Sequence, residues 1–348
     1  MVDVRRATAS DAEPIMRFIG EHWQQGHPLS TSRTLFDWQY SSRRHDGYSF
    51  MLGWRDAELL GVLGYISTAD LDPSLTADAT VWLALWKVRD DVRAGALGLR
   101  LLTALTRSEP HAAIGVVGIG DARHPAMYRS LGYETGTCTQ LVLFDARRDP
   151  TLARLPGNAH KPVSAGGDAT FEAVSGPELD AVMNALPSDD VVPRKTAAYL
   201  RRRFVEHPFY DYRLDVVSRR GRPSGVLVSR VARHGDACAV RFVDHVGDSA
   251  ALAHVGTAVA DLVADAGAEH ADLWLGGGDP APLVAAGFAP VDPDGPMVVP
   301  NHFEPYVAGN GRIEYAIRSG GRPFVIHRAD GDQDRPNRVD GDAVAVAT

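Results

Sequence analysis

Two consecutive segments decide the fold: WLALWKV at residues 82–88 and RAGALGLRLL at residues 93–102. The first is a run of apolar residues that predicts a buried strand, and the second continues from small residues into leucines at helical spacing. Small residues at positions 94, 95, 96 and 98 let backbone N–H groups approach an anion, and a helix start adds positive potential. The sequence therefore predicts a strand that opens into a helix through an anion-binding turn.

Two common phosphate-binding motifs do not fit this turn. A P-loop ends in Lys followed by Ser or Thr, and a dinucleotide fingerprint needs Gly-x-Gly-x-x-Gly after the first strand. Neither spacing is present, and the turn follows an internal strand. The alternative interpretation is a tight strand–helix junction packed with small residues.

A second motif lies downstream, where Asp121 is followed by YRSLGY at residues 128–133. Together with Arg93-x-x-Ala96-x-Gly98, it resembles the GNAT acyltransferase superfamily, which combines an Arg/Gln-x-x-Gly-x-Gly/Ala pyrophosphate loop with a later Asn-x6-Tyr-x-x-x-Gly-Phe pattern. The resemblance implies a GNAT acyltransferase fold in the first part of the chain.

The resemblance also implies a co-substrate, acetyl-CoA or another acyl-CoA, and no metal. The sequence departs from the family pattern at Ala96, where a glycine is usual, and at Arg89, where a proline is common. The residues expected to hold the acyl-CoA are Trp86, Lys87, Val88, Arg93, Ala94, Gly95, Ala96, Leu97, Gly98 and Leu99.

Catalytic roles follow from the same resemblance. In the family the helix tyrosine lies beside the acyl-CoA sulfur and protonates the leaving thiolate, which gives this role to Tyr128; the alternative is a half-buried packing aromatic. Asp121 and His124 border the expected thiol site and are candidates for removing a proton from the amine. A backbone N–H between Ala84 and Trp86 is expected to stabilise the negative charge on the carbonyl oxygen.

The sequence indicates the acceptor pocket less specifically than the acyl-CoA site. Trp23, His27 and Trp82 are expected to contact the acceptor, and core packing is the alternative for Trp82. The pattern Trp23-x3-His27-Pro28-Leu29 and the tail DGDQDRPN at residues 330–337 resemble tandem GNAT-like proteins of surface-polysaccharide and amino-sugar pathways. The tail has alternating carboxylates but lacks the later Gly and Glu of a calcium loop, so a docking turn is favoured over a metal site.

The full chain of 348 residues predicts two units. Strands and helices over residues 1–145 alternate in a way that favours a mixed α/β sheet, with apolar runs at residues 48–54 and 60–67 that predict a hairpin and a last strand at 140–144. Ser10 with Glu13 predicts a capping box for the first helix, and a strand is also expected at residues 312–318. SGVLV at residues 224–228 repeats LGVLG at residues 60–64, and LVAAGF at residues 283–288 repeats YRSLGY. A tandem repeat of one α/β fold is therefore expected.

The second copy is expected to be degenerate, because Asp244 and Asp248 stand where the first copy has its small-residue turn, and carboxylates oppose a pyrophosphate. The expected organisation is a GNAT catalytic unit at residues 1–145, a linker at 146–168, a degenerate GNAT-like unit at 169–300, a C-terminal extension packing on both units at 301–337, and a disordered tail at 338–348.

Composition limits the partners. A net charge of -8 and a pI of about 5.9 disfavour binding of nucleic acid, and the two cysteines, Cys138 and Cys238, lack zinc-site spacing. The N-terminus does not resemble a secretory signal, and no run approaches a membrane span, so a cytoplasmic protein without membrane partners is expected. The sequence does not determine the oligomeric state.

The sequence therefore predicts an N-acyltransferase that moves a short acyl group to a primary amine, with an amino sugar or nucleotide-linked sugar as the acceptor. Three alternatives stay open. They are a tRNA-dependent aminoacyl transferase with paired GNAT-like domains, a non-catalytic acyl-CoA-binding protein, and a mycothiol-synthase-like enzyme that acetylates a thiol precursor.

Overall fold

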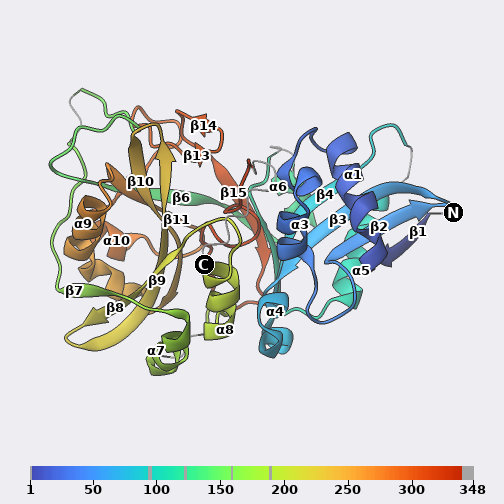
Figure 1. Cartoon of the computed structure of the whole chain (residues 1–348), viewed down its shortest axis with the longest axis horizontal. Coiled ribbons are helices and arrows are strands. Elements are labelled where there is room, and N and C mark those ends of the chain that lie inside the picture. The colour runs from blue at the N-terminus through green and yellow to red at the C-terminus, as the bar shows by residue number, and fades with distance from the viewer. Residues whose placement is uncertain (1, 93–95, 121–123, 158–159, 188–189, 339–348) are drawn as a thin grey trace, which may run out of the picture.

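The structure is a computed structural model that describes residues 2–92, 96–120, 124–157, 160–187 and 190–338 (Figure 1). The N-terminal half contains β1 (Asp3–Arg6), α1 (Ala12–His22), α2 (Pro28–Thr31), α3 (Arg33–Tyr40), β2 (Phe50–Arg55), β3 (Glu58–Ser67), α4 (Thr68–Leu71), β4 (Thr80–Val88), α5 (Leu97–Ser108), β5 (Ala113–Val117), α6 (His124–Ser130) and β6 (Glu134–Phe144). The remainder contains β7 (Ala169–Ala173), α7 (Leu179–Ala185), α8 (Ala197–Leu200), β8 (Arg213–Arg219), β9 (Arg222–His234), β10 (Ala237–Gly247), α9 (Gly256–Asp265), β11 (His270–Leu275), α10 (Ala281–Ala285), β12 (Ala289–Val291), β13 (His302–Phe303), β14 (Tyr306–Val307) and β15 (Ile313–Arg318).

One mixed sheet of 13 strands runs through both halves of the molecule. Its strand order is β1-β2-β3-β4-β5-β15-β6-β11-β10-β9-β8-β7, and β12 pairs with β6. The sheet therefore divides into two units of the same topology. The first has the order β1-β2-β3-β4-β5-β15-β6, and the second has the order β7-β8-β9-β10-β11-β6-β12. The chain is a tandem repeat of one mixed α/β fold.

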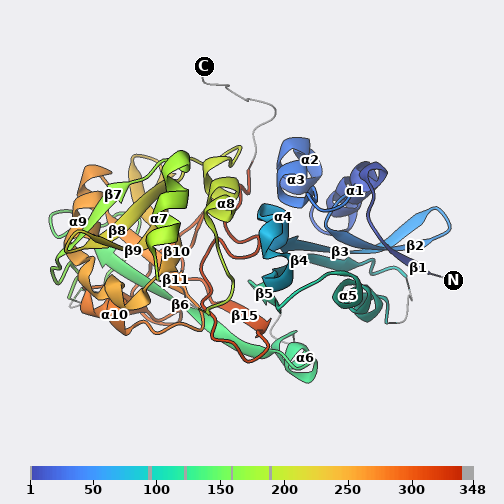
Figure 2. The ribbon, with the colours of Figure 1, turned by 90° about the horizontal axis from the view of Figure 1, so that it is seen from below.

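Helices cover both faces of the first unit's sheet. Figure 2 shows α1, α2 and α3 on one face, and α5 and α6 on the other. Each face has its own apolar core, since the leucines of α5 pack with Tyr128, whereas α1 and α3 pack with Phe50 and Leu85. Periodic leucines in α5 place Leu97, Leu101 and Leu105 on the buried side of that helix.

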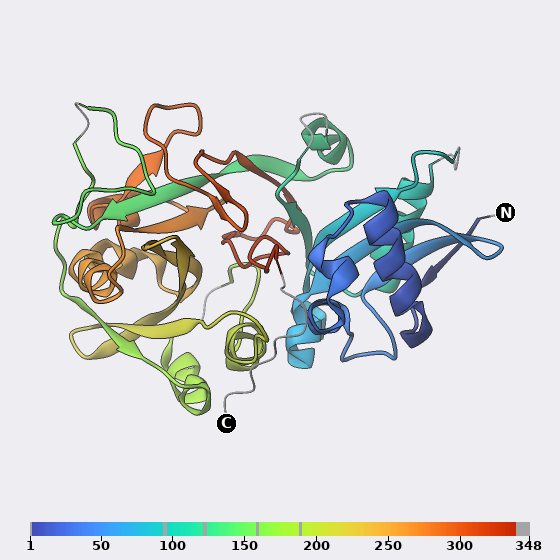
Figure 3. The same cartoon turned by 45° about the horizontal axis from the view of Figure 1, so that its top comes forward.

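The strand β6 is shared by the two units. Residues Glu134–Cys138 pair with β15 of the first unit, and Thr139–Phe144 pair with β11 of the second. In Figure 3 the long green strand crosses from one half of the molecule to the other. The predicted strand at residues 140–144 is thus only the second half of an 11-residue strand.

The strand β15 completes the first unit from the far end of the chain. It lies between β5 and β6, pairing with both antiparallel. The prediction of a strand near residues 312–318 is confirmed, but its position inside the first sheet was not expected. Local sequence patterns do not reveal pairing between residues so distant in the chain.

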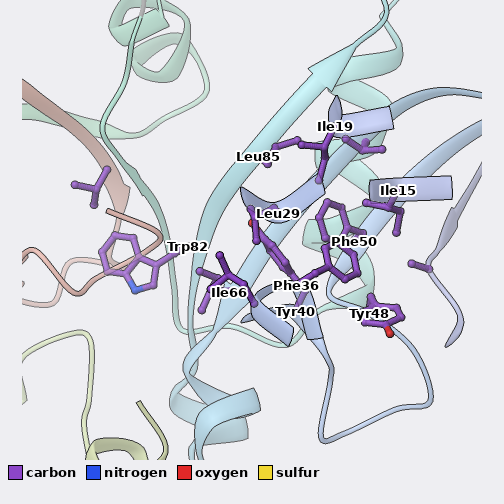
Figure 4. Close-up of a cluster of buried hydrophobic side chains, with 14 of the residues drawn as sticks. Ile15, Ile19, Leu29, Phe36, Tyr40, Tyr48, Phe50, Ile66, Trp82 and Leu85 are labelled. Carbon is purple, nitrogen blue, oxygen red and sulfur yellow. The ribbon is translucent and has the colours of Figure 1, made fainter. Parts of the chain in front are cut away.

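A cluster of aromatic side chains fills the core beneath α1 and α3. Figure 4 shows Phe36, Tyr40 and Phe50 together in it, and the Phe36 and Phe50 rings are 5.8 Å apart. These large side chains are fully buried. They fix the helices of this face against the sheet, because core packing of this density resists changes in volume.

The first helix begins differently from the prediction. The capping box is made by Thr8 and Asp11, before a short 3-10 turn, and not by Ser10 and Glu13. Asp11 accepts hydrogen bonds from the Thr8 backbone and hydroxyl at 2.7 Å each, and Arg5 binds both its oxygens. The bidentate bond with Arg5 on β1 gives Asp11 partners that no local capping motif reveals.

Asp11→Asn is expected to lower the free energy of unfolding at neutral pH by about 1–2 kcal/mol. Burial alone would raise the pKa of the Asp11 carboxyl, but hydrogen bonds from Arg5 and Thr8 outweigh it and lower this pKa to about 2. Since an unfolded Asp titrates near about 4, this contribution is complete above that pH and is lost as pH falls toward 2. Urea unfolding at pH 7 and near pH 2 measures it, and a difference between wild type and variant that persists at the lower pH would contradict the assignment.

The segment DGDQDRPN at residues 330–337 contacts both units. Asp334 accepts hydrogen bonds from Arg230 at 2.8 Å and from the Tyr212 hydroxyl at 2.6 Å. Arg335 reaches the other unit, with a guanidinium nitrogen 3.1 Å from His27 Nε2. These buried charge-assisted bonds tie the C-terminal segment to both units.

Candidate functional site

A β-bulge in β4 redirects its side chains. Leu83 pairs with Tyr65 and Trp86 pairs with Leu63, so two residues of β4, Ala84 and Leu85, lie opposite a single residue of β3. The extra residue changes the alternation of faces. Ala84 and Leu85 both pack on the α1–α3 core, and Trp86 turns to the opposite face, where it packs with α5 and α6.

The strands β4 and β5 separate at the same point. They pair in parallel from Thr80 to Leu83 only, with Leu83 opposite Val116. Beyond Leu83, the edge of β4 that faces β5 has no strand partner among the described residues. Bulge and separation together leave backbone groups at Ala84–Trp86 available to a ligand, which is the place predicted for stabilising a carbonyl oxygen.

The helix α5 begins beside this opening with an uncapped N-terminus. Its N-cap is Ala96, and among the described residues no side chain caps the first turn. The first backbone N–H groups of a helix need partners, and an anion supplies them. The predicted residues Arg93, Ala94 and Gly95 lie outside the described residues.

Ala96 adopts a left-handed conformation with φ of 58°. Glycine is usual at such a position because a Cβ atom costs about 1–2 kcal/mol there. Ala96→Gly is therefore expected to raise the free energy of unfolding by up to about 1 kcal/mol, because greater freedom of the unfolded chain offsets part of the gain. The matched control, Ala104→Gly inside α5, is expected to lower it by about 0.5–1 kcal/mol. Urea unfolding distinguishes the two, and equal losses would exclude strain at Ala96.

Trp86 lies between the start of α5 and Tyr128. A Cβ atom added at Gly98 would lie 3.3 Å from Trp86 Nε1, and the rings of Trp86 and Tyr128 are 6.5 Å apart in an edge-to-face arrangement. Tyr128 is 5% exposed, and burial raises the pKa of its phenol. The structure thus brings Trp86, Gly98 and Tyr128 to one face, and the phenol of Tyr128 is neutral.

The other residues predicted to bind the acyl-CoA differ in exposure. Leu97 is buried beneath β2 and β3, where it leaves no space for a side chain at Gly53, so only its backbone is available. Leu99 is 46% exposed. Lys87 forms an ion pair with Asp90 at 2.7 Å, and Val88 packs on the α5 core.

The candidate bases are less well placed by the structure. His124 is exposed at the start of α6, one turn before Tyr128. Asp121 lies outside the described residues. The role of each in removing the amine proton stays a prediction.

The three residues predicted to contact the acceptor lie in different environments. Trp23 is 47% exposed and lines a surface hollow at the end of α1. His27 is buried against Arg335, and burial and that guanidinium lower its pKa to about 4. Trp82 is buried against β5, where a Cβ atom at Gly115 would lie 2.8 Å from its ring. Of the three, Trp23 alone presents its side chain to solvent.

Gln333 is a neighbour of the opening that the sequence did not indicate. Its side-chain amide donates a hydrogen bond to the Val117 carbonyl at 3.1 Å, one residue beyond the last β4–β5 pair. Gly118, with φ of 81°, makes room for it, since a Cβ atom there would lie 2.5 Å from that amide. In the sequence, Gln333 is marked only as part of the motif DGDQDRPN, and this motif does not predict where the residue lies in the fold.

The second unit has the same bulge but a closed opening. β10 carries an extra residue at Val243, and β10 and β11 pair in parallel only up to Phe242. Residues 326–329, just before the DGDQDRPN segment, cross this gap. Ile326 pairs with Gly276 after β11, and the Ala329 N–H donates a hydrogen bond to the Val243 carbonyl at 2.9 Å. Leu283 stands where the first unit has Tyr128. The gap beside β10 is thus closed, and the second unit has no tyrosine at the position that corresponds to Tyr128.

Comparison with solved structures places the fold. No protein-family model matches the chain, and a search of curated proteins gives no match. A GCN5-related N-acetyltransferase from Anabaena variabilis superposes with a TM-score of 0.55 at 11% identity, covering 91% of this chain and 72% of its own. One from Kribbella flavida gives 0.53 at 12% identity, covering 91% and 71%. A conserved protein from Enterococcus faecalis gives 0.54 at 11%, covering 90% and 72%. The chain therefore shares the fold of GNAT N-acetyltransferases.

Two further findings bear on partners. No helix in the described part of the chain is long and apolar enough to cross a membrane. Within the same residues, no group of three or more His, Cys, Asp or Glu side chains is arranged to hold a metal ion.

Proposed function

We propose that the first unit is an acyl-CoA-dependent N-acyltransferase that moves an acetyl or other short acyl group to a primary amine. The observation that carries the proposal is the coincidence of three features on one side of β4. The strand bulges and parts from β5, an uncapped helix begins beside the gap, and a buried tyrosine lies across from both. Two of the structural neighbours are named N-acetyltransferases, which supports the same chemistry.

The residues present fit an acyl-CoA. The first turn of α5 offers backbone N–H groups to a pyrophosphate, and Gly98 leaves the approach to Trp86 open. When bound, acyl-CoA supplies an activated thioester. The free edge of β4 at Ala84–Trp86 donates hydrogen bonds to the carbonyl oxygen as it gains negative charge.

Transfer proceeds by direct attack of the amine, without a covalent enzyme intermediate. Tyr128 protonates the leaving thiolate, since its phenol carries the proton at neutral pH and its ring lies beside Trp86 on this face. Cys138 is not the nucleophile, because burial raises the pKa of its thiol to about 12 and the thiol is the unreactive form. Catalysis then comes mainly from positioning the amine and stabilising the oxyanion.

The acceptor is an amino sugar or nucleotide-linked amino sugar in this proposal, approaching from the Trp23 side of β4. His124 or Asp121 removes the proton from its ammonium group. The reaction belongs to the cytoplasm, where acyl-CoA is made and two buried free thiols remain reduced.

The experiment begins with calorimetric titration of acetyl-CoA into the whole chain, followed by thiol release across amino sugars, nucleotide-linked amino sugars and other primary amines. Binding with amine-dependent thiol release supports the proposal. Binding without turnover on any amine favours a non-catalytic acyl-CoA-binding protein. If acetyl-CoA does not bind and the protein transfers the aminoacyl group from charged tRNA, the protein is a tRNA-dependent aminoacyl transferase instead.

A further inference from the structure

A cavity of about 460 Å³ lies between the two units. The first unit contributes Asp72 and Ser74 to its lining, the second contributes α7, the start of α8 and the end of β10, and the C-terminal segment contributes Val325 and His327. Sites for small ligands typically enclose about 300–1,000 Å³ and often lie between domains. The cavity therefore has the size and position of a ligand site.

This cavity is not a second acyl-transfer site. The opening between β10 and β11 is crossed by residues 326–329, and Leu283 replaces the tyrosine of the first unit. The segment after β10 also contains Asp248, which binds the backbone of Ala250 at the following turn. A ligand of the cavity must be recognised by other chemistry.

Beside the cavity is a buried ion cluster. Lys195 Nζ lies 2.5 Å from Asp244 Oδ1 and 3.2 Å from Asp330 Oδ1, and both carboxylates are fully buried. Replacing such a buried ion cluster by apolar residues of similar volume generally leaves a fold at least as stable. In addition, Asp244 Oδ2 and His327 Nε2 have no hydrogen-bond partner among the described residues. Buried polar atoms without partners are rare, and His327 is also part of the cavity lining.

Two neutral imidazoles line the cavity. His327 Nδ1 lies 3.1 Å from the Trp274 carbonyl, which can only accept, so Nδ1 carries the proton and Nε2 keeps its lone pair. His245 lies opposite, with the two rings 6.3 Å apart. Burial lowers the pKa of His327 to about 4 and that of His245 to about 3. Both rings are therefore uncharged at neutral pH, and His327 offers a ligand the acceptor at Nε2.

The charges around the cavity are already balanced. Arg194 pairs with Asp78 at 3.0 Å, Asp180 pairs with Arg201 at 2.7 Å, and Lys195 lies between its two carboxylates. Burial raises the pKa of Asp244 and of Asp330, and the Lys195 ammonium opposes both shifts. Among the described lining residues, each cation thus has an acidic partner, and a phosphate would find no unpaired one.

The remaining polar groups of the cavity lining can form hydrogen bonds with the hydroxyl groups of a ligand. Asp72 is held by hydrogen bonds from Thr196 at 2.5 Å and Ser74 at 2.8 Å, which keep its pKa low although burial opposes this. Asn184 and Ser249 add an amide and a hydroxyl to the lining. The carboxylate accepts hydrogen bonds, and the amide and hydroxyl both donate and accept, so the lining supplies both kinds of partner that a molecule with many hydroxyl groups requires.

We propose that this cavity binds a neutral, hydroxyl-rich molecule of the size of a monosaccharide or disaccharide. The inference goes beyond the acyl-transfer proposal and does not depend on it, because the cavity lies at the junction of the units and uses none of the residues assigned to acyl-CoA.

The test is saturation-transfer NMR and calorimetry on the whole chain with glucose, N-acetylglucosamine and maltose. Glucosamine and glucose 6-phosphate serve as charged counterparts. Ala198→Phe fills the cavity from α8, and Met183→Trp fills it from α7, so that one variant remains if the other fails to fold. Val284→Phe is the control on an exposed position of α10, away from the cavity. Circular dichroism checks the fold of each protein.

Saturable binding of a neutral saccharide, weakened roughly tenfold or more in the folded cavity variants and unchanged in the control, is the expected result. The proposal is overturned if no neutral saccharide saturates, if the cavity variants keep full affinity, or if the control loses it equally. Tighter binding of glucose 6-phosphate than of glucose would overturn the assignment to a neutral ligand. Acetyl-CoA affinity, measured in the same variants, should stay unchanged and reports separately on the acyl-transfer site.

Discussion

Gly98→Glu is expected to weaken acetyl-CoA binding by about 100-fold or more, on the order of 3 kcal/mol. The new carboxylate would stand in the first turn of α5, where the proposed pyrophosphate meets uncapped N–H groups, and like charges repel at this distance. Its Cβ atom would also press on Trp86, 3.3 Å away. Calorimetric titration measures the loss.

The fold should survive this change. Glycine in a helix interior is about 1 kcal/mol less favourable than alanine, and an acidic side chain near a helix N-terminus is stabilising. Gly98→Gln separates bulk from charge, and Thr103→Glu places the same charge on the exposed side of α5, farther from its start. Equal affinity in Gly98→Glu and wild type would remove α5 from the acyl-CoA site.

Tyr128→Phe is expected to lower kcat by about 100-fold or more, with little change in the KM for acetyl-CoA. The variant keeps the ring that packs against Trp86 and Tyr133 and removes only the proton donor. Steady-state thiol release with the best amine measures both constants.

A packing role for Tyr128 predicts a different result. Loss of the hydroxyl would then leave kcat within a few-fold of wild type, and Tyr128→Leu would chiefly lower the melting temperature. Trp86→Phe is a useful companion, because it changes the neighbouring ring without touching the phenol.

Local patterns predicted most of the first unit. The hairpin of β2 and β3, the strand β4 and the helix α5 all follow from apolar periodicity, and the observed boundaries agree within a few residues. The repeat of LGVLG in β9 marked the second copy correctly, since β3 and β9 are the third strands of their units. Such features depend on neighbours in the chain, which a sequence displays directly.

The errors concern residues whose partners are distant in the chain. Asp11 replaced Glu13 in the capping box because it also binds Arg5. The first half of β6 was missed because its partner is β15. In these cases the decisive contact is tertiary, and intrinsic propensity is a weak guide when tertiary contacts compete.

The candidate site shows the same division. The sequence identified Trp86, Gly98 and Tyr128 separately, but the bulge that turns Trp86 toward the other two depends on pairing with β3. It did not indicate the cavity, whose lining is gathered from both units and the tail. Lys195 and His327 are isolated residues in the sequence, and the fold alone brings them to one cavity.

The strand exchange between the units constrains how the protein is made. β15 ends at Arg318, so synthesis must pass this residue before the first sheet can close. Until then β5 and β6 have unpaired edges, which in other proteins are sites of aggregation. Shortening the gene from its 3′ end would therefore damage the first unit as well as the second.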